Sequence, residues 1–180
     1  MTRDRLAFAA WLAVIAAAMY FGRQAQPYIE GPARAMLGWV LGLVWAWFLA
    51  LGLRLWLGLA PERRRRAWPW LLAALAGLTL LAWAQPLMIE RLHVVLYGVL
   101  GLLAYRLFRG RAPGRPRWQP ALLWAVAVSL ADELAQTLHP ERVGDPRDVA
   151  TNAVAAGLLV MACALLDPDA PAPEPARSPC

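Results

Sequence analysis

"SLADELAQTLHPERVGDPRDVATNAVAAG", residues 129–157, is the stretch that decides the fold of this sequence. One apolar run precedes it and another begins inside it. Between Asp132 and Asn152, however, it carries five acids, two arginines, a glutamine, a histidine and an asparagine. Charged groups beside apolar segments cost free energy unless they face one another or water. The direction in which these side chains point must therefore be inferred together with the rest of the sequence.

The composition places the chain in the membrane class. It has 180 residues, of which 60% are hydrophobic and 17% charged, with a mean hydropathy of +0.44. A soluble domain of this size carries more charge. Six apolar segments stand out, roughly residues 6–22, 35–59, 68–86, 91–108, 118–138 and 147–166. Most approach the ~20 residues that a helix needs to cross ~30 Å of hydrocarbon, which predicts an all-α polytopic transmembrane helical bundle of about six helices.

The arginines predict the orientation of this bundle. All 18 basic residues are arginine, and basic residues concentrate on the cytoplasmic side of membrane proteins. With six spans and a cytoplasmic N-terminus, 13 arginines lie inside and 5 outside; the outer ones are Arg23, Arg34, Arg91, Arg142 and Arg147. The net charge of +6 therefore reflects topology, and we expect the lipid bilayer, with no nucleic acid, as a partner. An alternative for residues 6–22 is a signal peptide behind Arg3 and Arg5.

Helical spacing brings the polar residues to one depth. At 1.5 Å per residue, Asp132 lies about 21 Å, His93 about 20 Å and Asn152 about 22 Å above the cytoplasmic interface. The same periodicity gives each of the last three segments a polar stripe: Glu90, His93 and Tyr97; Asp132, Glu133 and Gln136; and Asp145, Asp148 and Asn152. Because such groups face the bundle interior or water, we expect the stripes to meet in a polar crevice that opens outward, with residues 139–147 as its rim.

These residues also carry a family resemblance. "ERLHVVLYGVLGLLAY", from residue 90, and "DELAQTLHPERVGDPRDVATNAVAAG", from residue 132, resemble the VanZ-like family, which is named for a teicoplanin-resistance membrane protein. The matching positions are Glu90, His93, Tyr97, Asp132, Glu133, Gln136, Arg142, Asp148 and Asn152. Asp145 and Pro146 depart modestly from the family's loop, which usually has a small or polar pair before the aspartate.

The resemblance covers roughly residues 85–165 and divides the chain into three parts. Residues 1–84 are the first three transmembrane helices, residues 85–166 the VanZ-like core with helices four to six, and residues 167–180 a proline-rich, disordered cytoplasmic tail. The likeness implies a multi-pass protein of the bacterial cytoplasmic membrane. It also implies a role in the cell envelope, where some members affect susceptibility to glycopeptide antibiotics.

Several roles stay open for the polar residues. Asp132, Glu133 and His93 are the candidate catalytic acids and bases, and all nine matching positions are candidate ligand-binding residues. His93 is alternatively a core residue or a ligand of a divalent metal ion; no cofactor is predicted. Arg142 is either solvated, or it grips an anion or pairs with Glu133. Asp145 and Pro146 have the sequence of a helix start.

Three functions compete on these grounds. The first is a non-catalytic envelope protein that binds a cell-wall or lipid-linked ligand in the crevice. The second is a membrane enzyme that acts on a lipid headgroup or a lipid-linked sugar by acid/base chemistry. The third is a small transporter or flippase, which is disfavoured because the sequence lacks paired broken helices. The oligomeric state stays open.

Overall fold

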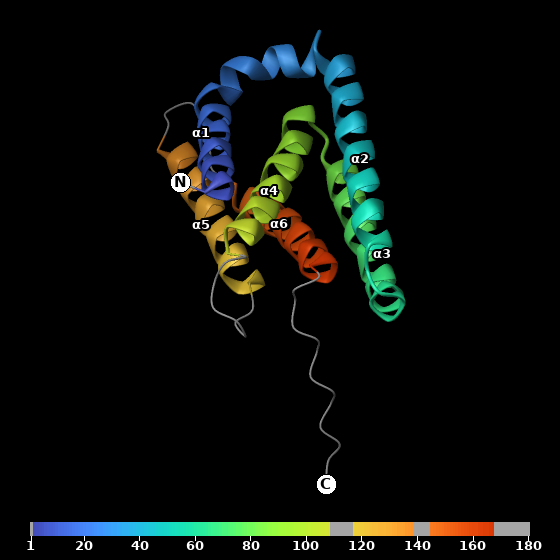
Figure 1. The fold of residues 1–180 in the computed structure, drawn as a ribbon. Coiled ribbons are helices and arrows are strands. Elements are labelled where there is room, and N and C mark those ends of the chain that lie inside the picture. Colours follow the sequence, from blue (N-terminus) through green and yellow to red (C-terminus); the bar gives the residue numbers. More distant parts are fainter. Residues whose placement is uncertain (1, 109–116, 139–144, 168–180) are drawn as a thin grey trace.

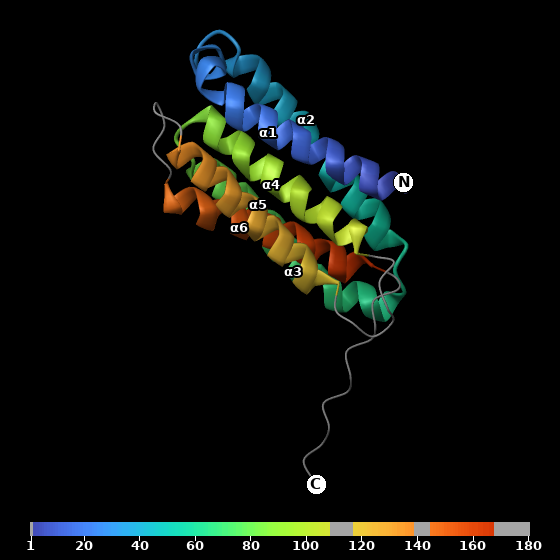
Figure 2. The same cartoon turned by 90° about the vertical axis from the view of Figure 1, so that its left-hand side faces the viewer.

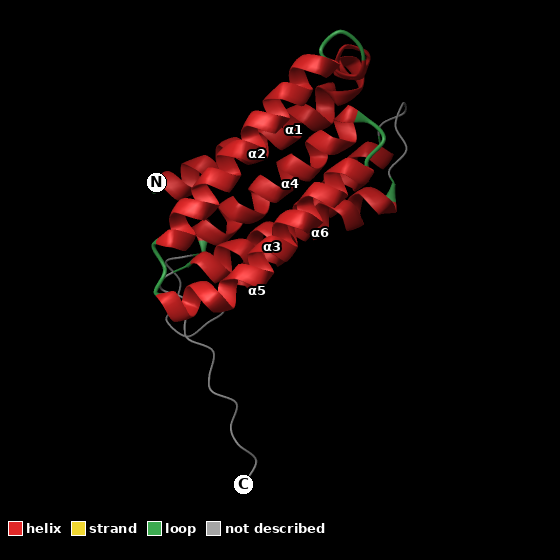
Figure 3. Cartoon of the chain, turned by 90° about the vertical axis from the view of Figure 1, so that its right-hand side faces the viewer, coloured by secondary structure: helices red, strands yellow, loops and turns green. Residues whose placement is uncertain are grey.

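The computed structural model describes residues 2–108, 117–138 and 145–167, and these ranges contain six helices and no strand. The helices are α1 (Arg3–Glu30), α2 (Arg34–Leu57), α3 (Pro61–Ala84), α4 (Met88–Leu107), α5 (Trp118–Thr137) and α6 (Pro146–Leu166). They run alongside one another in one bundle (Figure 1), and short described connections join α1 to α2, α2 to α3 and α3 to α4 (Figure 3). The predicted all-α class is confirmed.

Five of the six helices are long and apolar enough to cross a membrane: α1, α2, α3, α4 and α6. The exception, α5, has 20 residues, as many as α4. Its shortfall lies in composition, because Asp132, Glu133 and Gln136 lower the mean hydropathy of its second half. Figure 2 shows α5 lying beside α4 and α6 along most of its length. The residues that reduce its apolar character are therefore held against other helices.

The centre of the bundle is the contact between α4 and α6. Tyr97 and Leu100 of α4 are completely buried, as are Ala155 and Ala156 of α6. The two backbones approach closely at Gly101, where an added Cβ would lie only 2.5 Å from the carbonyl oxygen of Ala156. Small residues at such points allow membrane helices to pack through van der Waals contact, since no hydrophobic effect operates between helices in lipid.

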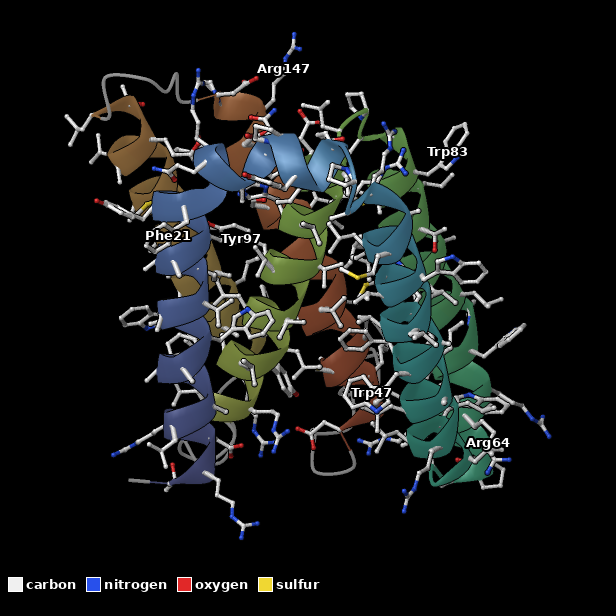
Figure 4. All side chains as sticks on the ribbon, turned by 90° about the horizontal axis from the view of Figure 1, so that it is seen from above. Phe21, Trp47, Arg64, Trp83, Tyr97 and Arg147 are labelled. Carbon is white, nitrogen blue, oxygen red and sulfur yellow. The ribbon has the colours of Figure 1, made fainter. Side chains whose placement is uncertain are left out.

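The first helix packs against this centre and then turns. Phe8 and Ile15 are buried in the core, and Nε1 of Trp11 donates a hydrogen bond of 2.8 Å to the carbonyl oxygen of Leu96 on α4. The helix continues beyond the predicted apolar segment to Glu30, and its last turns bend across the end of the bundle (Figure 4). They contain Pro27, which lacks the N–H needed for a helical hydrogen bond.

In contrast, α2 has no buried residue. Its C-terminal end is attached to α3, because Nε1 of Trp56 donates to the carbonyl oxygen of Arg64 at 3.2 Å. Nη2 of Arg64 in turn donates to the carbonyl oxygen of Leu57 at 2.7 Å. Along the rest of its length α2 makes few contacts with α4 and α6, although Trp45 packs against the cluster of Leu78, Val94 and Ala155. The uniformly apolar sequence of α2 did not predict this loose packing.

The end of the bundle opposite Arg147 is rich in arginine (Figure 4). There Arg106 of α4 forms an ion pair of 3.0 Å with Asp4 of α1. Asp167, the first residue of the predicted tail, is buried at the end of α6, where its carboxylate accepts hydrogen bonds from Tyr105 and Arg117. The other predicted tail residues, 168–180, lie outside the described part of the chain.

Two glycine substitutions on α4 test the close approach of α4 to α6. We expect Gly101→Ala to lower the free energy of unfolding by about 1–3 kcal/mol, because its methyl group would collide with the α6 backbone. Gly98→Ala on the same helix should cost nothing, since its Cβ would meet Leu159 at an ordinary 3.6 Å. Unfolding in detergent micelles measures both. Equal stability of the two variants would contradict the close approach.

Candidate functional site

A buried hydrogen bond joins α4 to α5 in the part of the bundle nearer Arg147 (Figure 4). The hydroxyl of Tyr97 donates to Oδ2 of Asp132 at 2.6 Å, and the two residues are 0% and 5% exposed. Gln136, one turn further along α5, donates from Nε2 to Oδ1 of Asp132 at 3.1 Å. Both carboxylate oxygens thus have a donor, as a buried acid requires.

A second buried pair joins α5 to α6. Nδ2 of Asn152 donates to Oγ of Ser129 at 3.1 Å, and neither residue is more than 1% exposed. Ser129 lies three residues before Asp132, so the two contacts occupy one face of α5. Oδ1 of Asn152 is buried without a hydrogen-bond partner among the described residues. The expected convergence of the last three helices is therefore present, through two direct side-chain contacts.

Glu133 ties α5 to the start of α6. Its Oε2 accepts from the backbone N–H of Asp145 at 2.9 Å, and its Oε1 lies 3.4 Å from Nε2 of Gln136. Asp145 in turn accepts from the N–H of Arg147 at 2.8 Å, so it caps α6 as predicted. The alternative partner for Glu133, Arg142, lies outside the described residues.

His93 lies half-buried above Tyr97, with the two rings stacked at 6.5 Å and 13°. Its Nδ1 is 3.0 Å from the carbonyl oxygen of Ile89. A carbonyl only accepts, so Nδ1 carries a proton and Nε2 is left to face other groups. Within the described part of the chain, Nε2 has no hydrogen-bond partner. The ring does interact electrostatically with Glu133 and with the half-buried Asp148.

Glu90 and the end of α1 border this region. Oε2 of Glu90 accepts from the N–H of Leu87 at 3.3 Å, which places its carboxylate at the start of α4. Glu30 of α1 accepts from the N–H of Ile89 at 3.0 Å. Beside it is an open depression of about 520 Å³, lined by Arg23, Gln26, Pro27 and Glu30. The last turn of α1 is thereby fixed one helical turn from His93.

The predicted crevice is closed in its deeper half, where the polar side chains are buried and bonded. Tyr97, Asp132, Glu133 and Asn152 are all buried and bonded to one another or to Ser129, Gln136 and Asp145. The close packing of α4 on α6 closes this space, and sequence periodicity does not report how tightly helices pack. Glu90, His93 and Asp148 keep partial exposure at the end of the bundle. His139, Arg142 and the rest of the expected rim before residue 145 lie outside the described residues.

Ser129 belongs to the network but to none of the three predicted stripes, although its place one turn before Asp132 is a usable signal. Glu30 was not predicted at all, because nothing in the order of the residues shows that α1 bends toward α4. In the described ranges no three His, Cys, Asp or Glu side chains lie close enough together to hold a metal ion. Chemically, the arrangement is a buried hydrogen-bonded network beneath an oriented imidazole and partly exposed carboxylates.

The Ser129–Asn152 contact leads to a stability prediction. Ser129→Ala should lower the free energy of unfolding in detergent by about 1–2 kcal/mol, because it leaves the buried amide of Asn152 without an acceptor. Adding Asn152→Leu should recover part of this loss, since it removes the unpaired group. Thr79→Ala is the control, because Thr79 bonds only within its own exposed helix surface. A loss for Ser129→Ala no larger than for Thr79→Ala would refute the contact.

Comparison with known proteins gives one match. A family model described as VanZ/LLP1 matches residues 83–167, a range that contains all nine positions on which the resemblance was based. No curated protein matches the chain, and neither does any solved structure. The matched range begins just before α4 and ends with α6, so it coincides with the helices that build the polar network. Residues 83–167 are therefore a VanZ-like region, and this region lies in a chain whose described part includes five helices that are long and apolar enough to cross a membrane.

Proposed function

We propose that this protein binds a cell-wall or lipid-linked ligand at the outer end of α4, α5 and α6, and that it thereby influences susceptibility to glycopeptides. The observation that carries the proposal is the buried Tyr97–Asp132 bond beneath His93. Ionisable groups within membrane helices are expensive, and such groups usually serve function. A network that only held helices together would need no partly exposed imidazole above it.

The chemistry of the exposed groups favours a ligand rich in hydrogen-bond donors. Glu90 and Asp148 are acceptors when ionised, and Nε2 of His93 accepts in the neutral tautomer that Ile89 selects. Sugar hydroxyls and the amines of a cell-wall peptide are donors of this kind. The predicted anion contact, Arg142, would add a grip on a pyrophosphate linkage. A lipid-linked cell-wall precursor combines all of these groups with an apolar chain.

The same contacts disfavour an enzyme that uses Asp132 or Glu133 as its general acid or base. Asp132 and Glu133 were the candidate general acid and base, but each has both oxygens engaged by donors. Groups held in this way position their neighbours, and proton transfer to a substrate would require them to give up a bond. His93 remains the group that an enzyme would use, because its Nδ1 is oriented by Ile89 and its side chain is partly exposed.

We place the protein in the bacterial cytoplasmic membrane, with the arginine-rich end inside and the His93 end outside. The distribution of arginines supports this orientation. The family resemblance supports the bacterial envelope. A site on the outer face is also accessible to a cell-wall precursor after its export and to a glycopeptide that arrives from outside the cell.

His93→Gln and Asp148→Asn should each weaken binding of a polyprenyl-pyrophosphate-linked cell-wall precursor by about 10–100-fold, the equivalent of one lost hydrogen bond to a charged group. Neither change should alter stability, because neither side chain belongs to the buried network. Titration of the full chain in lipid nanodiscs measures the affinity.

Arg147→Gln is the matched control, since Arg147 is exposed at the same end of the bundle. In cells, expression of the wild type should raise the teicoplanin concentration needed to inhibit a sensitive bacterium, and His93→Gln should abolish this rise. Unchanged precursor affinity in both site variants would overturn the proposal. Turnover of the precursor that His93→Gln eliminates would replace binding with the enzyme alternative.

A further inference from the structure

A large apolar cleft separates α2 from the central helices. Its volume is about 1070 Å³, and its walls come from α2, α3, α4 and α6, with Trp11 of α1 also contributing. Trp47 projects from α2 into this side of the bundle (Figure 4), and Val99 and Leu102 line the opposite wall on α4. The cleft exists because α2 has no fully buried residue and reaches the central helices mainly through Trp45, which packs against the cluster of Leu78, Val94 and Ala155.

An apolar cleft of this size requires an occupant when it lies at membrane depth. Its walls belong to helices that are long and apolar enough to span a bilayer. An unfilled space forfeits the dispersion contacts of every atom that lines it, and water is excluded from hydrocarbon. Acyl chains are the apolar material that a bilayer supplies in excess.

The two ends of the cleft differ in charge. Arg106, Tyr105 and Asp167 line it at the arginine-rich end, together with Trp56 and Trp68. Asp167 is already engaged by Tyr105 and Arg117, so its charge is compensated. Arg106 pairs with Asp4, but its side chain remains 56% exposed. Tryptophan and arginine side by side are typical of the level at which lipid headgroups lie.

More positive charge surrounds the same end. Arg54, Arg65 and Arg66 are exposed there, and the guanidinium of Arg64 lies over the Trp56 ring at 5.1 Å. Arginine binds phosphate through two parallel hydrogen bonds, and each basic residue near an anionic lipid surface contributes attraction. The charge of this end therefore matches a phosphate that carries no compensating ammonium group.

We propose that the cleft between α2 and the α4–α6 pair binds one anionic phospholipid, with its acyl chains along the apolar walls and its phosphate at Arg106. A second copy of the chain fits less well. Both copies would have the same orientation in the membrane, so two arginine-rich ends would meet and repel each other. This site is separate from the proposed ligand site, since its charged residues lie at the opposite end of the bundle and the two sites share no residue.

Native mass spectrometry of the full chain tests this site. The delipidated protein is mixed with equal amounts of phosphatidylglycerol and phosphatidylcholine that carry identical dioleoyl chains. The wild type should retain phosphatidylglycerol about fivefold over phosphatidylcholine, the selectivity expected of one arginine–phosphate contact. Arg106→Gln should abolish this preference.

Two matched controls separate charge from structure. Asp4→Asn breaks the same ion pair as Arg106→Gln but leaves the arginine in place, so it should keep or increase the preference for phosphatidylglycerol. Val99→Trp fills the cleft and should abolish lipid retention. Leu123→Trp adds the same bulk on the exposed face of α5 and should retain lipid like the wild type. If circular dichroism shows that Val99→Trp unfolds, Leu102→Trp takes its place.

Three results would overturn the proposal. The first is equal retention of the two phospholipids by the wild type. The second is the same loss of preference in Asp4→Asn as in Arg106→Gln, which would trace the effect to the ion pair. The third is a lipid-free dimer that Val99→Trp dissociates, which would assign the cleft to a second copy of the chain.

Discussion

The carboxylate of Asp132, held between Tyr97 and Gln136 inside a largely apolar bundle, is the constraint on which the rest of the structure depends. An acid in this environment must be paired, because an unpaired one costs several kcal/mol. Its pairing sets the rotation of α4 against α5. The Ser129–Asn152 contact then sets the rotation of α6 against α5. Once these faces are fixed, His93 stacks on Tyr97, and the partly exposed Glu90 of α4 and Asp148 of α6 border the same end of the bundle.

The two ends of the bundle are consequently different environments. At one end, backbone and side-chain acceptors surround an oriented imidazole, which is suited to a ligand with many donors. At the other end, arginines and tryptophans border a cleft that α2 leaves open. Asp167 connects α4, α5 and α6 there through Tyr105 and Arg117, so the arginine-rich end also has a buried acid at its centre. Both ends follow one physical rule, since each buried acid is satisfied by donors from neighbouring helices.

Part of the polar network was predictable, because the helical period puts Asp132 and Gln136 on one face of α5 and places Tyr97 on the same stripe of α4 as His93. The predicted depths matched Asp132 with His93, whereas the structure bonds Asp132 to Tyr97, one turn further along α4. The closing of the crevice was not predictable, since it depends on the backbone approach at Gly101, which neither hydropathy nor spacing reports. Asp167 precedes a proline-rich segment and has the sequence character of a tail, although its carboxylate is buried. The cleft beside α2 could not be predicted from the sequence either. A helix that is apolar on all sides can be buried in the bundle or can face lipid, and its sequence does not distinguish the two.

A double-mutant cycle between Tyr97 and Asp132 tests the central claim most directly. The free energies of unfolding of Tyr97→Phe, Asp132→Asn and the double variant would be measured in the same detergent micelles as the wild type. A direct buried bond predicts a coupling energy of about 1–2 kcal/mol, so the double variant should be markedly more stable than the sum of the single losses implies. Additive losses, with a coupling indistinguishable from zero, would mean that the two side chains do not meet, and the arrangement of α4, α5 and α6 described above would be wrong.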